Sequence, residues 1–512
     1  ALVGAGDDEW DSLEDQVYIQ LVGVLYNLSE DFGQKEGLDR IIELHTRGVH
    51  ADFEKVHKAI RHYQLTNAYS LRDSWSEDET AYTFFDSDDL IEAIGHARAS
   101  VSEEYAPAMS KSREVQSLVN FANILSRAGR VCEALVWYNK AIEARPDHSM
   151  ALGNRAQCKC HYAAVLFSRS HEALYLHSAY HDFKNAVENW DDPHPYAESQ
   201  FKARMQSIKE YADDKLDIEN EEEYDLGESE LDVEYHRWVL NNNLYLNPLN
   251  DIFTHTSTAH DPFHLPDMII PDGEDFPYPG IYNQMKQEYT SARYTYYEGI
   301  TKSGGGAHFS DRDVSLPDPL DYTVYGYHTE QIKTALRMSY SIFDKIAIFI
   351  NEYFGVGQTD PNFSEVWNED GDYNKGLADA FRDSENWALN ALYWIKKDFY
   401  HGISKNDEDS IVVVAHELKS IRNAVEHDYI KVFDDGIVSS PPDRTLLSDS
   451  DYDAIGKSEL QKAALEMLRI ARAALIYLSL AVHHEENKKR SEIDSPTLPV
   501  SGEVTVPDKF KQ

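Results

Sequence analysis

The chain has 512 residues, of which 42% are hydrophobic and 12% are aromatic. This composition excludes a globally disordered chain, and the length favours roughly two to four domains. Acidic residues outnumber basic residues by 90 to 48, which gives a formal net charge of -42. Because nucleic-acid phosphates are bound mainly by Lys and Arg, this charge argues against general, sequence-independent binding to nucleic acid. A role in RNA processing would need a local basic cleft or a tightly regulated site.

Cysteine content and hydropathy indicate the compartment. The three cysteines, Cys132, Cys158 and Cys160, are few and odd in number, which favours a reducing cytoplasm over a disulfide framework. The longest apolar stretch, residues 473–482, is about half the roughly 20 residues that a membrane span needs, and no secretory signal precedes the first helix. We therefore expect a cytoplasmic protein with no membrane association, and we predict no metal and no cofactor.

The amino-terminal part of the chain has the apolar spacing of helices. Residues 1–103 are expected to form a helical region, and residues 104–212 a set of helical hairpins. In residues 112–147 the hairpin pattern is carried by Leu118, Phe121, Ala122, Leu125, Gly129, Ala134, Tyr138, Ala141 and Pro146. This spacing resembles a tetratricopeptide repeat, in which small residues let two helices approach, Gly129 makes the turn and Pro146 ends the second helix. A distorted second copy is expected to start near Ala151.

The carboxy-terminal half is predicted to be a helical bundle. Residues 213–275 are expected to form an acidic linker and connector, since residues 213–232 carry eleven acidic residues and one Lys. Residues 276–490 contain five segments with apolar stripes at helical spacing and no clear alternating strand, which favours an up-and-down bundle. Residues 491–512 are expected to be a flexible tail. The predicted fold class is therefore all-α throughout.

One of these five segments carries a group of side chains that could take part in catalysis. The sequence RNAVEHDY places Arg422, Asn423, Glu426, His427 and Tyr429 close together on the expected helix. Taken alone, Arg422 and Glu426 form an ordinary helix-stabilising pair at four-residue spacing, and a single His is most often structural. Arg and His at this spacing, with upstream blocks at residues 238–251 and 282–294, resemble the HEPN family. The similarity extends over roughly residues 231–485 and resembles a prokaryotic branch in which tetratricopeptide-like repeats precede the HEPN domain.

The resemblance implies a metal-independent endoribonuclease. His427 would move a proton, because its ordinary pKa lies near neutrality, and Arg422 would donate hydrogen bonds to phosphate oxygens. Asn423 would position the phosphate or His427, with Glu426 in support. Arg422 and His427 lie about 140° apart around an ideal helix, which suits the facing motifs of the homodimers known in this family. Tyr429 corresponds to a residue that some HEPN toxins have modified by a partner nucleotidyltransferase.

Several other polar groups have either a functional or a structural interpretation. Glu288 and Arg293 lie in a tyrosine-rich helix and would either support the active cleft or form structural ion pairs. Asp344 and Lys345 interrupt an apolar helix, and a buried salt bridge is expected there. A metal could use the spacing of His255, His260 and His264, with Asp261, but no helix or strand frames them, so we interpret them as part of a surface loop.

The architecture resembles regulated effectors of antiviral and stress defence. The repeats would bind a protein or peptide partner, and the bundle would cleave RNA. Two alternatives stay open from the sequence. The first is a non-catalytic adaptor in which the HEPN bundle only dimerises. The second is a toxin restrained by a partner antitoxin.

Overall fold

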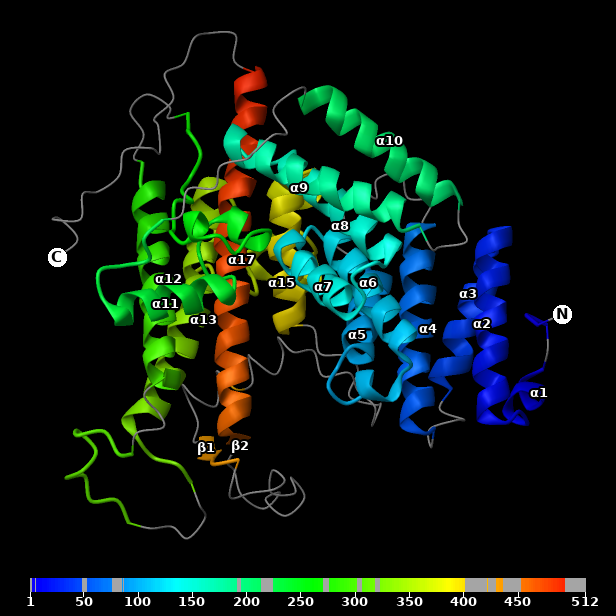
Figure 1. The fold of residues 1–512 in the computed structure, drawn as a ribbon, viewed down its shortest axis with the longest axis horizontal. Coiled ribbons are helices and arrows are strands. Elements are labelled where there is room, and N and C mark those ends of the chain that lie inside the picture. The colour runs from blue at the N-terminus through cyan, green and yellow to red at the C-terminus, as the bar shows by residue number, and fades with distance from the viewer. Residues whose placement is uncertain are drawn as a thin grey trace. The chain divides into compact units, whose positions relative to one another are not determined.

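The computed structural model is almost entirely helical and divides into two units (Figure 1). The residues it describes are 2–4, 6–47, 53–75, 85, 87–190, 195–212, 224–269, 276–301, 306–317, 323–400, 421, 430–435 and 453–492. The first unit is formed by Ala1–Glu219, and the second by Asn220–His401 and Val414–Gln512. The predicted all-α fold class is confirmed.

The first unit begins with five helices whose apolar faces form its amino-terminal core. Their bounds are α1 Asp7–Asp11, α2 Asp15–Phe32, α3 Lys35–Thr46, α4 Lys55–Ser74 and α5 Asp88–Ser100, and the 3₁₀ turn η1 Ala106–Ala108 follows. Helix α5 starts where the Ser87 side chain accepts a hydrogen bond from the backbone N–H of Leu90, which satisfies one of the unpaired donors of the first turn. Consecutive helices pack on one another, with α4 against both α3 and α5.

The rest of the first unit repeats a helical-hairpin pattern. Its helices are α6 Lys111–Arg127, α7 Val131–Ala144, α8 Ser149–Ala163, α9 Arg169–Glu188 and α10 Pro195–Ala212. Helix α6 pairs with α7, α8 with α9, and α10 packs on α9. The turn predicted at Gly129 is confirmed, because this residue has a φ of 79°, a conformation that favours glycine. The resemblance of these hairpins to tetratricopeptide repeats stays a prediction.

The second unit is a bundle of long helices preceded by a connector. Its helices and turns are α11 Glu230–Asn241, η2 Pro248–Asp251, η3 Thr256–Thr258, α12 Tyr278–Thr301, α13 Tyr327–Tyr353, η4 Glu369–Gly371, η5 Tyr373–Lys375, α14 Asp379–Arg382, α15 Trp387–Tyr400 and α17 Lys457–Glu492. The apolar stripe predicted on α12 is buried as expected, from Tyr282 through Tyr289 to Tyr296.

The last helix, α17, organises this bundle. It has 36 residues, is buried from Ala473 to Val482, and packs against α12, α13 and α15. The hydroxyl of Tyr282 donates to the carbonyl of Leu475, and the hydroxyl of Tyr296 donates to that of Gln461. These two bonds show that α12 and α17 run antiparallel. Helix α17 is buried on more than one face, since three helices pack against it.

Two short strands interrupt the helical pattern. Strand β1 (Ile430–Phe433) pairs in parallel with β2 (Asp453–Gly456), so that Ile430 lies opposite Asp453. No strand was predicted within residues 276–490, and this was wrong, because strands form at residues 430–433 and 453–456. The reason is local: Ile430, Val432 and Phe433 favour extended backbone, and the carbonyl of Val432 accepts a hydrogen bond from the N–H of Val324 at 2.7 Å.

Candidate functional site

The predicted catalytic motif lies outside the residues that the structure describes. This holds for Arg422, Asn423, Glu426, His427 and the modification candidate Tyr429. Their roles stay predictions.

The chain that follows the motif is anchored on two sides. Strand β1 starts at Ile430, one residue after Tyr429. On one side, Thr323 forms an antiparallel bridge with Phe433, which joins β1 to the segment that leads into α13. On the other side, the Asp435 carboxylate accepts a hydrogen bond from the N–H of Ser458 at 2.9 Å, in the first turn of α17. Bonding to Ser458 lowers the pKa of Asp435, so this carboxylate stays charged at the positive end of the α17 dipole.

Arg293, proposed as a supporting residue, is buried in a cage of aromatic rings. Its guanidinium donates to both carboxylate oxygens of Asp261, at 2.9 and 2.8 Å, and to the carbonyl of Leu244 at 2.8 Å. The rings of Tyr245 and Tyr289 lie 5.1 and 5.6 Å from its central carbon. Burial alone would raise the pKa of Asp261, but Arg293 beside it brings the pKa below the ordinary value.

A second buried arginine anchors the connector. Arg472 on α17 donates to the Asp251 carboxylate at 2.6 Å and to the carbonyls of Tyr245 and Asn247. The connector therefore packs into the second unit through two arginines, one from α12 and one from α17. Main-chain carbonyls of residues 244–247 and the carboxylates of Asp251 and Asp261 supply the acceptors that these two buried cations require.

Glu288, the other supporting residue, has a different partner from Arg293. Its carboxylate forms an ion pair with Lys345 of α13 at 2.9 Å, and both side chains are about one quarter exposed. Lys345 thus forms a salt bridge that links α12 to α13, but the pair is partly exposed and not buried as expected. Glu288 and Arg293 do not bond each other, and each of them ties α12 to a neighbouring segment. Sequence reasoning missed the partners Asp261 and Asp251, because nothing local marks contacts over such long chain separations.

The three histidines between η2 and α12 do not converge on a common centre. The Nδ1 atom of His264 lies 2.6 Å from the carbonyl oxygen of Leu265, and burial lowers the pKa of His260. Asp261, which lies between them in the sequence, is bound by Arg293. Within the described ranges, no group of three His, Cys, Asp or Glu side chains is arranged to hold a metal ion.

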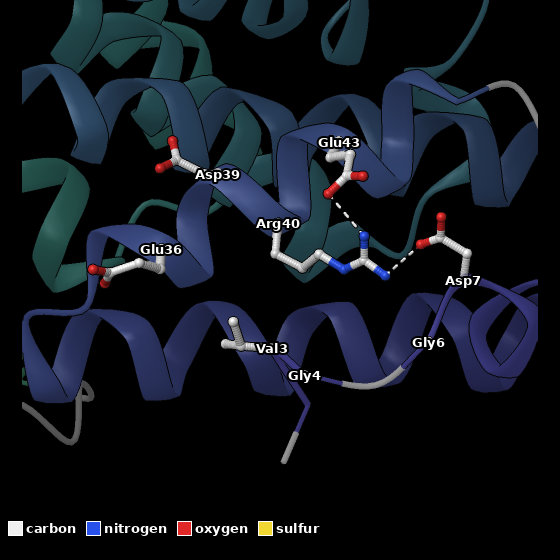
Figure 2. A pocket seen from close by; sticks show the side chains of 8 residues that line it. All are labelled: Val3, Gly4, Gly6, Asp7, Glu36, Asp39, Arg40 and Glu43. Atoms are coloured by element: carbon white, nitrogen blue, oxygen red, sulfur yellow. Dashed lines mark hydrogen bonds and ion pairs between the residues drawn. The ribbon is translucent and has the colours of Figure 1, made fainter.

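An open pocket in the first unit is lined mainly by acidic side chains (Figure 2). Arg40 points into it and bridges Asp7 and Glu43, at 2.7 Å to each. The hydrogen bond from Arg40 lowers the pKa of Asp7. A cation that already bonds two carboxylates is a poor receptor for a further anion, so the arrangement fits a structural clamp between α1 and α3.

Comparison with known protein families identifies a domain within the second unit. Residues 271–485 match the family described as LA2681-like HEPN. These residues form a HEPN domain. The predicted family membership of the carboxy-terminal part is thereby confirmed, and the HEPN domain includes α12, α13, α15, both strands and most of α17. This family match does not extend to the amino-terminal hairpins, so their resemblance to tetratricopeptide repeats is not confirmed by it. No significant match was found among curated proteins or among solved structures.

None of the described helices is long and apolar enough to cross a bilayer.

Proposed function

We propose that this protein is a metal-independent endoribonuclease whose active site is built by Arg422 and His427. The observation that carries the proposal is that the Arg-x4-His spacing lies inside residues 271–485, the part matched to the HEPN family. HEPN domains are often ribonucleases. Within the described residues of this part, helix α17 packs against α12, α13 and α15.

The reaction needs only the substrate's own groups and these side chains. His427 accepts the proton of a ribose 2′-hydroxyl, whose oxygen attacks the adjacent phosphorus. The bond from phosphorus to the 5′-oxygen breaks, and the leaving oxygen takes up a proton from the protonated His427. Arg422 donates hydrogen bonds to the non-bridging oxygens, where negative charge develops. The products are a 2′,3′-cyclic phosphate and a 5′-hydroxyl.

Asn423 and Glu426 assist these two residues. Asn423 lies four residues before His427, on the same face of the expected helix, and holds the imidazole or the phosphate by hydrogen bonding. Glu426 lies four residues after Arg422, where it orients the guanidinium. The domain acts as a homodimer in the cytoplasm, and the amino-terminal hairpins bind a protein or peptide that controls cleavage in defence or stress.

The test is an RNA cleavage assay in EDTA with total RNA and tRNA. Wild-type protein is expected to cleave and to leave cyclic phosphate ends, whereas His427→Ala is expected to be inactive and folded. Equal cleavage by both proteins would remove His427 from the mechanism. A folded dimer that cleaves no RNA would favour the adaptor function.

A further inference from the structure

Helix α2 has two apolar faces, and only one of them is used inside the first unit. The helix packs against α3 and α4, and it lies at the edge of the unit (Figure 1). Its buried residues are Tyr18, Ile19, Val22, Leu25 and Ser29. A second row of apolar residues lies on a different face of the helix and is here called the α2 seam. The seam consists of Val17, Leu21, Val24, Leu28 and Phe32.

The seam is open to solvent along the length of the helix. Val17, Val24 and Leu28 are 41%, 46% and 42% exposed. Phe32 is 71% exposed, and Leu21 is partly exposed. Single exposed apolar side chains are common on protein surfaces, but an aligned row of them indicates a surface that contacts another molecule.

The spacing of the seam is that of a helix which pairs with another helix. From Val17 to Leu28 its residues follow one another at intervals of four, three and four. This alternation keeps the apolar side chains on one line, and it is the pattern by which two helices interlock their side chains. The helix ends at Gly33, whose φ is 61°, so the whole seam lies on one continuous helix.

The face that carries the seam has no charge. Residues 16–29 contain no Asp, Glu, Lys, Arg or His, although 27% of the whole chain is charged. The exposed polar side chains in this range are the neutral amides of Gln16, Gln20 and Asn27. Two copies of a chain with net charge -42 repel each other. A contact between copies is therefore least opposed where neither copy brings a charged side chain.

The same absence of charge argues against other partners. A basic protein would gain affinity from acidic residues beside its contact, and residues 16–29 supply none. Helices that lie on membrane surfaces carry Lys and Arg on their polar face, whereas α2 contains neither. A second copy of this chain is the partner that fits both observations.

We propose that two copies of this chain associate through their α2 seams about a two-fold axis. In such a contact both copies contribute the same residues, so Val24, the middle residue of the seam, lies opposite its counterpart. The contact belongs to the first unit and lies outside residues 271–485. It is therefore independent of the proposed nuclease site and adds to any pairing through the HEPN domain.

A disulfide across the two-fold axis tests the contact in the full chain. Val24→Cys is expected to form a covalent dimer under mild oxidation, because residues that face each other across paired helices come close enough for a disulfide. Wild type is the first control, since Cys132 and Cys158 are buried. Tyr196→Cys is the matched control, because Tyr196 is 74% exposed and lies in α10 of the same unit. Both controls are expected to cross-link at least about tenfold more slowly, because their cysteines meet only by random collision.

A charge placed in the seam tests whether the apolar face holds the copies together. In the Val24→Cys background, Leu28→Glu is expected to slow cross-linking at least about tenfold, because the contact would then bury two like carboxylates. Tyr196→Glu in the same background is expected to have no effect. Circular dichroism should show that both variants are folded, since neither Leu28 nor Tyr196 belongs to the core.

Three outcomes would overturn the proposal. The first is a Tyr196→Cys protein that cross-links as fast as Val24→Cys. The second is cross-linking of Val24→Cys that Leu28→Glu leaves unchanged. The third is the absence of a covalent dimer in Val24→Cys, which would assign the seam to a different partner.

Discussion

The HEPN domain buries two arginines, and each of them forms an ion pair with a carboxylate of the connector. Arg293 bonds Asp261, and Arg472 bonds Asp251. A buried ion pair is weak evidence of net stabilisation, since two charges must leave water. Removing one partner is strongly destabilising, because the other charge then stays buried without a countercharge and with little solvation. These pairs therefore fix the connector to α12 and α17. A single substitution in either pair is expected to lower the stability of the folded protein.

Asp261→Asn is predicted to destabilise the protein by about 3–5 kcal/mol, because Arg293 would remain buried without a countercharge. Urea unfolding monitored by circular dichroism measures this free energy. Lys333→Ala serves as control, since Lys333 pairs with the exposed Glu330 and should cost less than about 1 kcal/mol. A loss below about 1 kcal/mol in Asp261→Asn would show that the pair is not needed to hold the connector.

Stability is also predicted to fall in acid in a way that depends on Asp261. The pKa of this carboxyl is lower in the folded protein than the value of 3.8 expected when it is exposed. The unfolded chain therefore binds the proton more readily, and the stabilisation is complete above about pH 4 and lost as the pH falls through the folded pKa. Urea midpoints measured from pH 7 to pH 3 should fall more steeply for wild type than for Asp261→Asn. Parallel curves would contradict this assignment.

Helices α8 and α10 approach each other closely at Gly153, which has no side chain. A methyl group at Gly153 in α8 would meet the ring of Phe201 in α10 at 2.0 Å. At Gly280 in α12 the same methyl group would meet nothing within 4 Å. Gly153 thus explains why α10 can lie against the α8–α9 hairpin, where Phe201 and Phe183 belong to one buried cluster.

Gly153→Ala is predicted to lower the free energy of unfolding by about 1–3 kcal/mol, because the Phe201 ring must move out of a packed core. Gly280→Ala is predicted to be neutral or to stabilise by about 0.4–1 kcal/mol, since it only restricts the unfolded chain. Chemical denaturation of both variants gives the comparison. Equal effects of the two substitutions would contradict the packing explanation.

Helices were the part of this fold that the sequence could predict. The stripe of Tyr282, Tyr289 and Tyr296 repeats at helical spacing, and the structure buries that face. Strand β1 was missed because four residues after a helical pattern carry too little periodicity to separate strand from helix. The anchors of the site were missed for a different reason. Asp251 and Arg472 are separated by 221 residues, so no local pattern could pair them.

At the scale of the whole molecule, the positions of Arg422 and His427 bear on whether one chain or two chains build the active site. Arg422 and His427 are five residues apart in the chain, about 140° around an ideal helix. A site that combines Arg422 of one copy with His427 of another resolves this separation. A symmetric dimer would then hold two such sites, and each would need both chains.

Mixing Arg422→Ala with His427→Ala is therefore predicted to restore cleavage. In an equal mixture of exchanging subunits, about half of the dimers are mixed and each has one complete site, so activity should reach about a quarter of wild type. Each variant alone should be inactive. Absence of recovery, with subunit exchange verified by labelled chains, would place both residues of a site in the same chain.

The most direct test of the central claim uses an RNA with a single 2′-deoxy nucleotide on the 5′ side of a mapped cleavage position. The 2′-hydroxyl is the nucleophile in the proposed reaction, so its removal should abolish cleavage at that position in EDTA and leave cleavage elsewhere unchanged. Mass spectrometry of the unmodified RNA should show 2′,3′-cyclic phosphate and 5′-hydroxyl ends. Cleavage at the deoxy position, or ends with a 3′-hydroxyl and a 5′-phosphate, would contradict the account.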